Sequence, residues 1–405
     1  MEKNVLYISY DGMTDPLGQS QVIPYLKGLV DLGHHIYLVS AEKKERFEKN
    51  GEDLWKQLNA FNIHWHPVMY SNMIPGISAY LTYRRLRNKS MQLSIQQPID
   101  IVHCRSYIPA IIGLEIKNRF SCKLIFDMRG FWADERVEGG IWHLKNPLYK
   151  RAFDFFKKKE YELLQHSDAI ISLTENAKQE MLGRNELSII PEKITVIPCC
   201  ADLDFFSEKN AAPDRTAFRK ELGIQSKDFV LCYSGSTGTW YLLNEMLRFF
   251  SCLHEAHPDS IFLLVTMDAP EIILAEAKKL RLPAKKIIIR SVARKLMPQY
   301  LSIADAAIFF IRNSFSKKAS SPTKMGEFMS MGIPIICNSG VGDVDVIMKQ
   351  CNAGIVLSSL DNATMKAAAI QLLQSSFSKE KIIAAAQSLS LEKGIGQYQQ
   401  VYLSL

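Results

Sequence analysis

Short apolar segments alternate with helical patterns along nearly the whole chain, and this alternation limits the possible folds more than any other feature. The apolar segments occupy residues 5–9, 36–39, 63–68, 99–103, 123–127, 169–172 and 194–197, and then 229–233, 261–265, 286–289, 305–310, 333–337 and 354–357. Apolar strands that are separated by helices are typical of parallel sheets covered on both faces. The sequence therefore predicts an α/β protein.

The alternation pauses once, after Pro198, in a polar stretch that runs over residues 199–215. We expect two Rossmann-like, doubly wound domains, residues 1–205 and 206–388, which face each other across a cleft. Residues 389–405 are expected to be a tail, with a helix that returns to the first domain. Ligands of such folds bind at the carboxyl ends of the strands, so functional residues are expected there.

Composition excludes several other classes of protein. The chain has 405 residues, of which 47% are hydrophobic and 22% charged, and this balance is typical of globular proteins. We expect no membrane-spanning segment and no signal peptide, because the apolar runs are short and the chain starts directly with a strand pattern. The eight cysteines form no CxxC pair and no metal spacing, so a zinc site is not expected.

Residues 320–340 predict a helix that is followed at once by a buried strand. Ser320 or Ser321 can cap the helix, Pro322 suits its first turn, and Gly332 and Pro334 end it.

The start of this helix is a candidate phosphate site, because free backbone N–H groups and the positive end of the helix dipole lie there. The candidate residues are Pro322, Thr323, Lys324 and Glu327. Thr323 and Glu327 share one helix face, where the carboxylate can accept hydrogen bonds from the hydroxyls of a ribose. An ordinary amphipathic helix with a solvated Glu327 is the alternative.

Glycine-containing loops follow the first strand of each domain, and the loop of the second domain is expected to open a helix over residues 240–250. Gly235, Ser236 and Thr237 offer small residues and backbone N–H groups to a phosphate, although the segment matches neither a Walker loop nor a dinucleotide-binding loop. A plain turn is the alternative. In the first domain, the predicted loop over residues 11–20 is long for a connection, and Gly18 and Gln19 are candidates on the acceptor side.

One strand of the first domain ends in a carboxylate and a guanidinium group. Asp127 can accept from sugar hydroxyls or take a proton, and Arg129 can neutralise phosphate. An Asp–Arg pair that braces the loop is the alternative. His103 and Arg105 end the preceding strand at the same edge, although a lone histidine there can equally be structural.

Two predicted helices are strongly basic within a chain of net charge +7. One carries Arg84, Arg85, Arg87 and Lys89, and the other spans residues 150–159. No nucleic-acid motif is present, so no nucleic-acid partner is expected. Contact with an anionic membrane surface fits this pattern, and solvated helix faces are the alternative.

Taken in order, these segments resemble the family-4 glycosyltransferases, which have the GT-B fold, over nearly the whole chain. The resemblance rests on residues 321–327 and 332–336, together with 197–202, 172–175 and 99–103. It implies a retaining enzyme that needs no metal or other cofactor and binds a nucleoside-diphosphate sugar mainly in the second domain. By resemblance, Glu327 is the second glutamate of the E-x7-E motif, which contacts ribose, and Ser291 and Val292 frame the base.

Three departures from the family pattern bear on the site. Ala319 stands where the first glutamate of the motif is expected, the family's Arg and Lys are missing after the strand at 229–233, and residues 127–129 replace its usual histidine. Lys324, Arg312 and Arg129 are therefore the candidates for the positive charge that a departing diphosphate needs.

The sequence thus predicts a retaining glycosyltransferase that uses a sugar nucleotide of the UDP or GDP type. The expected acceptor is a glycan or a lipid-linked molecule in cell-surface polysaccharide synthesis, and the expected location is cytoplasmic, with peripheral contact to the inner face of the membrane. A nucleotide-sugar epimerase on the same fold and a non-catalytic partner subunit, which Ala319 would fit, are the alternatives. The base, sugar, linkage, acceptor and oligomeric state are left open.

Overall fold

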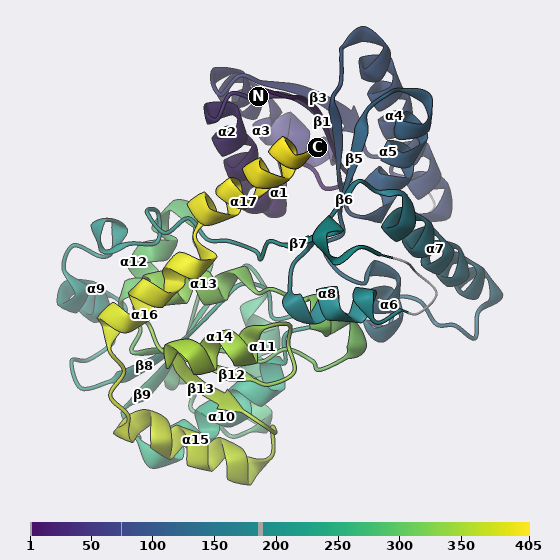
Figure 1. Ribbon diagram of the computed structural model, residues 1–405. Coiled ribbons are helices and arrows are strands. Elements are labelled where there is room, and N and C mark those ends of the chain that lie inside the picture. The colour runs from purple at the N-terminus through teal and green to yellow at the C-terminus, as the bar shows by residue number, and fades with distance from the viewer. Residues whose placement is uncertain (1, 74, 185–188) are drawn as a thin grey trace. The chain divides into compact units, whose positions relative to one another are not determined.

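The computed structural model describes residues 2–73, 75–184 and 189–405, which fall into two compact units (Figure 1). The first unit comprises Met1–Cys199 and Leu391–Leu405, and the second comprises Cys200–Ser390. The division lies a few residues before the expected boundary at residue 205. Within the described residues, each helix is too short or too polar to cross a bilayer.

A parallel sheet forms the centre of the first unit. In its described part the sheet has seven strands in the order β3-β2-β1-β4-β5-β6-β7. The strands are β1 (Asn4–Ser9), β2 (His35–Glu42), β3 (Ile63–Met69), β4 (Ile101–Arg105), β5 (Lys123–Asp127), β6 (Ala169–Ser172) and β7 (Ile194–Val196). Consecutive residues of β1 and β4 are buried, so both faces of the sheet are covered. The strand order reverses between β1 and β4, and the carboxyl ends of these strands meet there.

The helices of the first unit begin at sequence-encoded caps in several cases. They are α1 (Pro16–Gln21), α2 (Ile23–Asp31), α3 (Lys44–Ala60), α4 (Pro75–Gln96), α5 (Tyr107–Arg119), α6 (Trp132–Glu138), α7 (Pro147–His166), α8 (Glu175–Leu182) and α17 (Leu391–Ser404), with the 3-10 helix η1 (Pro191–Lys193). The Asn146 side chain accepts from the Leu148 amide at the start of α7, and Thr174 accepts from Ala177 at the start of α8.

The C-terminal helix α17 belongs to the first unit and lies beside α2 in Figure 1. Glycine at position 28 allows the close contact, because a Cβ atom there would lie 2.3 Å from Ile395 Cδ1 and the Ile395 side chain would have to move. Tyr398 and Tyr402 of α17 are buried in the unit. The tail therefore completes the hydrophobic core of the domain in which the chain begins.

The second unit repeats the architecture. Its described strands form a parallel sheet in the order β10-β9-β8-β11-β12-β13. They are β8 (Phe229–Ser234), β9 (Ser260–Val265), β10 (Ile287–Arg290), β11 (Ala306–Phe309), β12 (Ile335–Asn338) and β13 (Gly354–Leu357). The helices are η2 (Glu208–Asn210), α9 (Arg215–Glu221), α10 (Leu243–Ala256), α11 (Pro270–Lys279), η3 (Ala284–Lys286), η4 (Arg294–Leu296), α12 (Met297–Ser302), η5 (Phe315–Ala319), α13 (Thr323–Ser330), α14 (Val344–Cys351), α15 (Asn362–Gln374), α16 (Lys379–Ala386) and η6 (Gln387–Leu389).

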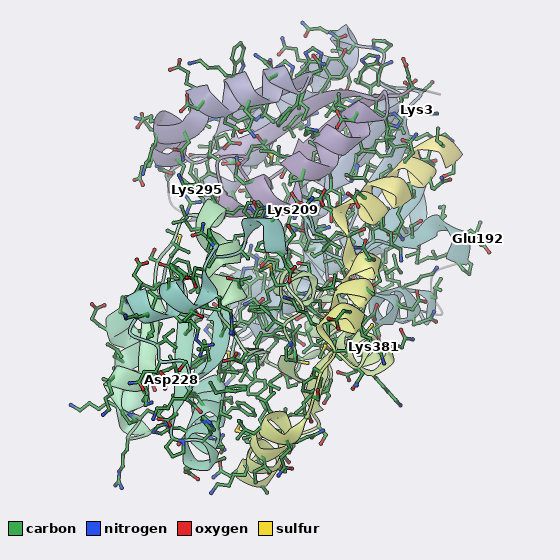
Figure 2. The ribbon with its side chains drawn as sticks, turned by 90° about the vertical axis from the view of Figure 1, so that its left-hand side faces the viewer. Lys3, Glu192, Lys209, Asp228, Lys295 and Lys381 are labelled. Atoms are coloured by element: carbon green, nitrogen blue, oxygen red, sulfur yellow. The ribbon has the colours of Figure 1, made fainter. Side chains whose placement is uncertain are left out.

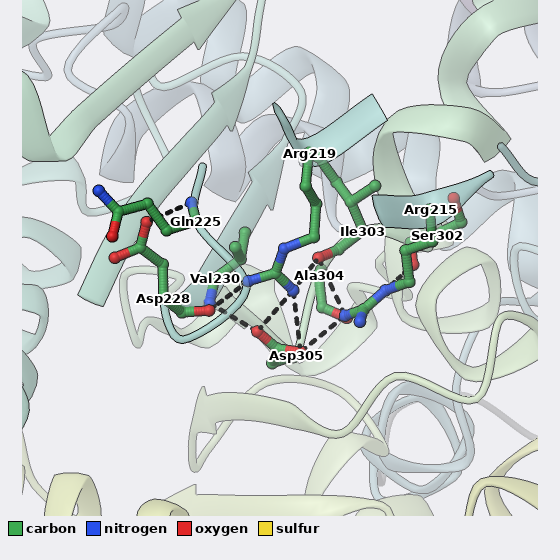
Figure 3. A network of polar contacts seen from close by, with 9 residues as sticks. All are labelled: Arg215, Arg219, Gln225, Asp228, Val230, Ser302, Ile303, Ala304 and Asp305. Atoms are coloured by element: carbon green, nitrogen blue, oxygen red, sulfur yellow. Dashed lines mark hydrogen bonds and ion pairs between the residues drawn. The ribbon is translucent and has the colours of Figure 1, made fainter. Parts of the chain in front are cut away.

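A polar network fastens α9 to the amino ends of the strands β8 and β11 (Figure 3). Asp305 accepts from the Val230 amide at 2.8 Å and pairs with Arg215 at 2.7 Å and with the buried Arg219 at 3.3 Å. Arg219 also donates to the carbonyl of Asp228, which precedes β8 and is labelled in Figure 2. This network lies at the amino ends of the strands, opposite to the edge where ligands bind in such folds.

The doubly wound fold predicted for both halves of the chain is confirmed, whereas three helix starts were predicted wrongly. Residues 11–20 are not one loop, because α1 begins at Pro16. The helix expected from Trp240 begins at Leu243, because residues 240–242 pair with 310–312 through backbone hydrogen bonds. Neither Ser320 nor Ser321 caps α13: Pro322 is its N-cap, and Ser320 ends η5.

Candidate functional site

The ammonium group of Lys324 lies between two tyrosine rings in the second unit. Lys324 is in the first turn of α13, and its Nζ lies 3.5 Å from the ring centre of Tyr241 and 4.1 Å from that of Tyr233. Nζ is also 3.1 Å from the Tyr233 hydroxyl. The two rings are 5.9 Å apart. We call Tyr233 and Tyr241 the tyrosine seat.

Burial lowers the pKa of Lys324 to about 7, although Glu327 and Cys232 oppose the shift. Lys324 is only 8% exposed, and it has no ion-pair partner within 4.0 Å in the described part of the chain. A desolvated ammonium group without a counter-ion is costly, and cation–π contacts offset only part of that cost. An arriving anion would therefore stabilise the protonated form.

Gly235 leaves the approach to this ammonium group open. The residue is exposed and follows β8 with φ of 109°, a conformation that favours glycine. A Cβ atom at this position would lie 3.1 Å from Lys324 Nζ. Two sequence-predicted residues of different segments, Gly235 and Lys324, are thus brought together.

Ser236 and Thr237 are held by a carboxylate that the sequence interpretation missed. Asp268 accepts from the Thr237 amide, from the Thr237 hydroxyl at 2.7 Å and from the Ser236 hydroxyl at 3.3 Å. Burial alone would raise the pKa of Asp268, but these hydrogen bonds lower it. The loop therefore does not open a helix as expected, and its Thr237 amide is already occupied.

Glu327 lies one turn along α13 from Thr323. Burial raises the pKa of its carboxyl group, and the positive charges of Arg294 and Lys324 oppose that shift. Arg294 Nη1 is 4.0 Å from Glu327 Oε1, and the guanidinium group also lies over the rings of Phe205 and Phe206 at 5.3 and 5.6 Å. A carboxylate with one weak ion pair keeps accepting capacity for hydroxyl groups.

The remaining donor-side candidates lie on loops of the second unit. Ser291 is exposed after β10, and Val292 packs against the core. Arg312 is exposed, and its amide donates to the Trp240 carbonyl. Pro322 is buried at the N-cap of α13.

Lys317 of η5 is a second buried lysine that the sequence interpretation did not single out. Its Nζ lies 3.6 Å from the ring centre of Trp240. Trp240 and Tyr241 are adjacent in the chain, so neighbouring aromatic side chains contact both lysines. Ala319, where the family has a glutamate, is buried at the end of η5.

In the first unit, Asp127, His103 and Arg105 form a buried polar cluster. Asp127 is 1% exposed and lies 3.7 Å from His103 Nε2 and 4.0 Å from Arg105 Nη1. Burial would raise the pKa of Asp127, but Arg129, His103 and Arg105 lower it to about 2. Arg129 Nη1 is 3.6 Å from Asp127 Oδ1. The backbone of Arg129, in the turn after β5, has a φ of 59°, a left-handed conformation that is uncommon for residues other than glycine.

Two tyrosines of α17 close this cluster, and no local sequence signal pointed to them. The Tyr398 hydroxyl donates to Asp127 Oδ2 at 3.2 Å, and the Tyr402 hydroxyl is 2.7 Å from His103 Nδ1. Burial lowers the pKa of His103, although Asp127 opposes the shift. The arrangement matches the bracing alternative of the sequence analysis, and a catalytic role for Asp127 stays a prediction.

Gly18 and Gln19 lie in α1. The turn before this helix is fixed by the buried Glu42, which accepts from the Met13 and Thr14 amides at 2.7 and 3.0 Å. Gln19 Nε2 donates to the Met13 carbonyl at 2.7 Å. These residues are therefore engaged within the turn.

The basic residues of α4 differ in their contacts. Arg87 pairs with Glu115, and Arg85 donates to the Met69 carbonyl at 2.7 Å. Arg84 is exposed and lies 5.9 Å from the ring centre of Tyr80, and Lys89 donates to Gln92 at the long distance of 3.4 Å. Among the described residues, no group of three His, Cys, Asp or Glu side chains could hold a metal ion.

Two family models of glycosyltransferases match the chain, one in each unit. Residues 20–205 match the model of Glycosyltransferase Family 4, and residues 214–389 match that of Glycosyl transferases group 1. The chain is a glycosyltransferase of this two-domain kind. A search of the curated proteins gives no match.

Solved structures show that this glycosyltransferase has the GT-B fold. HepE from Anabaena, in complex with UDP and glucose, has a TM-score of 0.71 at 12% identity and covers 100% of both chains. A glycosyltransferase from Rickettsia africae has a TM-score of 0.71 at 17% identity and covers 99% of this chain and 98% of its own. WaaG, a glycosyltransferase involved in lipopolysaccharide biosynthesis, has a TM-score of 0.71 at 14% identity, with 98% and 99% coverage.

Proposed function

We propose that this glycosyltransferase transfers a sugar from a nucleoside diphosphate of the UDP or GDP type to a glycan or lipid-linked acceptor, with retention of configuration. The observation that carries the donor assignment is the position of Lys324. Its ammonium group lies in the first turn of α13, beside the exposed Gly235, and lacks an ion-pair partner among the described residues.

Each part of the donor has a candidate partner in the second unit. Lys324 and the backbone N–H groups at the start of α13 bind the diphosphate. Glu327 accepts hydrogen bonds from the ribose hydroxyls, and Ser291 and Val292 frame the base. The complex of the related HepE with UDP and glucose supports a donor of this class.

The proposed reaction needs neither a metal ion nor another cofactor. As the bond between the sugar C1 and the phosphate oxygen breaks, the acceptor oxygen bonds to C1 on the same face, and the departing phosphate oxygen takes the acceptor proton. Lys324, with Arg312 as a further candidate in the same unit, stabilises the charge that develops on the diphosphate. The burial of Asp127 is consistent with a pathway that requires no dedicated base.

A lipid-linked or membrane-bound acceptor fits the surface of the first unit. Arg84 on α4 is exposed, and α7 exposes Leu148 and Phe155 near its basic residues, a combination suited to an anionic surface. The role of the related WaaG in lipopolysaccharide biosynthesis supports a cell-surface product. We propose a cytoplasmic enzyme that binds peripherally at the membrane. Binding to phosphatidylglycerol vesicles that is lost at high salt would support this location, and equal binding to neutral vesicles would contradict it.

The donor assignment is tested by calorimetry with UDP, GDP, UDP-glucose and GDP-mannose, followed by incubation of any bound sugar nucleotide without acceptor. We expect one nucleotide class to bind and its sugar to be hydrolysed slowly, with the anomer of the released sugar reporting retention. Binding without hydrolysis or transfer would favour the non-catalytic subunit. Conversion to an epimer would favour the epimerase.

A further inference from the structure

The Lys324 ammonium group is held mainly by aromatic rings. The tyrosine seat supplies two ring faces and one hydroxyl group, at 3.5, 4.1 and 3.1 Å from Nζ. A lysine stem has several rotatable bonds, so an ammonium group on an exposed lysine samples many positions. Contacts with two rings and one hydroxyl restrict the Lys324 ammonium group to a single position.

The position of Tyr241 in the chain makes this contact informative. The loop over residues 235–242, which follows the first strand of the second unit, carries no basic side chain of its own. This chain carries Trp240 and Tyr241 in that loop, and both rings contact lysines from other segments, Lys317 of η5 and Lys324 of α13. The positive charges beside this loop therefore come from lysines of other segments, Lys317 of η5 and Lys324 of α13.

We propose that Tyr233 and Tyr241 are positioning residues, which hold the Lys324 ammonium group where it can bind the diphosphate of the sugar nucleotide. This inference rests on the proposed function, and it assigns a role to two side chains that do not themselves contact the donor. The phosphate would approach Lys324 Nζ from the side of Gly235, because this residue has no Cβ atom to occupy the space beside the ammonium group.

The electrostatic surroundings of Lys324 agree with this assignment. The groups whose charges act on it are Glu327 on α13 and Cys232 on β8, and the Tyr233 hydroxyl is a further titratable neighbour. Burial raises the pKa values of both Cys232 and Tyr233, so neither supplies a negative charge at neutral pH. Glu327 is left as the only anionic side chain among these neighbours, and it is one turn away.

Substitutions of the seat test the proposal in the full-length protein. Tyr241→Leu removes a ring face, Tyr241→Phe keeps it, and Tyr233→Phe removes only the hydroxyl. The matched control is Tyr300→Leu, because Tyr300 is a half-buried tyrosine of the same unit that packs on Phe218. Each variant is titrated with UDP-glucose and GDP-mannose over the range from about pH 6 to about pH 8 and with inorganic pyrophosphate at one fixed pH, and its folding is checked by thermal melting.

We expect Tyr241→Leu to weaken sugar-nucleotide and pyrophosphate binding roughly tenfold and to shift the pH midpoint of binding, because the ring no longer holds the charge. Tyr241→Phe should bind within about twofold of the original chain. In a Lys324→Met background, Tyr241→Leu should add nothing, because the tyrosine acts through the lysine.

Two results overturn the proposal and are distinguishable. If the unaltered protein binds none of the probes, the proposed function fails and the inference fails with it. If it binds a probe but Tyr241→Leu and Tyr233→Phe keep the same affinity and pH midpoint, only the inference fails. Should Tyr241→Leu not fold, Tyr233→Phe decides alone, since it keeps the ring volume.

Discussion

Sugar-nucleotide binding should be coupled to proton uptake at Lys324. Its pKa in the unbound protein is lowered by burial to about 7. At about pH 6 roughly nine tenths of the molecules carry the charge, and at about pH 8 roughly one tenth do. If the bound diphosphate keeps Lys324 protonated throughout, the dissociation constant rises about tenfold between these pH values, and almost one proton is taken up per binding event at about pH 8.

The assay is calorimetry at about pH 8 in two buffers with different ionisation enthalpies, with UDP-glucose and GDP-mannose as ligands. Sugar nucleotides are chosen because both phosphates are diesters, whereas the terminal phosphate of a free diphosphate titrates near pH ~6 and would obscure the protein proton. Lys324→Met should abolish the uptake and weaken binding at about pH 6 by about 1.5–3 kcal/mol, the usual size of a charged hydrogen bond.

Control variants separate Lys324 from its neighbours. Lys318 is an exposed lysine of η5, so Lys318→Met should leave both the affinity and the proton uptake unchanged. Glu327→Gln should weaken binding but keep a proton uptake, because the lysine remains. A dissociation constant that is flat over this pH range, with equal heats in the two buffers, would refute the reasoning.

Three further predictions concern other parts of the protein. Glu327→Gln should weaken sugar-nucleotide binding by about 1.5–3 kcal/mol in calorimetry, whereas Glu271→Gln on the exposed face of α11 should not. The pKa of Asp127 is about 2 in the folded protein, below its usual 3.8, so its stabilising effect is present above about pH 4 and lost as the pH falls toward 2. Asp127→Asn should therefore lower the free energy of unfolding by about 2 kcal/mol near neutral pH, in urea denaturation, and the deficit should shrink in acid; an unchanged midpoint would contradict this. Asp305→Ala should lower the free energy of unfolding by about 1–3 kcal/mol in urea denaturation, because it removes the main anionic partner of the buried Arg219. A variant that is as stable as the original protein would show that the network contributes little.

Sequence determined the architecture of each unit because the signals involved are local. Runs such as 5–8 and 124–126 are apolar throughout, and only a strand covered on both faces buries such a run. The order of strands and helices along the chain then implies a parallel, doubly wound sheet. The donor-side prediction at Lys324 and Glu327 came from the same kind of local pattern, one helix turn after a predicted helix start.

Only the tertiary structure decided which groups meet, because the decisive contacts join segments far apart in the chain. Lys324 contacts Tyr233 and Tyr241, which precede it by more than eighty residues, and Asp127 contacts Tyr398 of the C-terminal helix. Contacts between residues so far apart in the chain produce no periodic pattern in the sequence from which they could be predicted. The sequence by itself thus determined that a cation lies at the start of α13, while packing determined that its charge is held by aromatic rings with no carboxylate within pairing distance in the described chain.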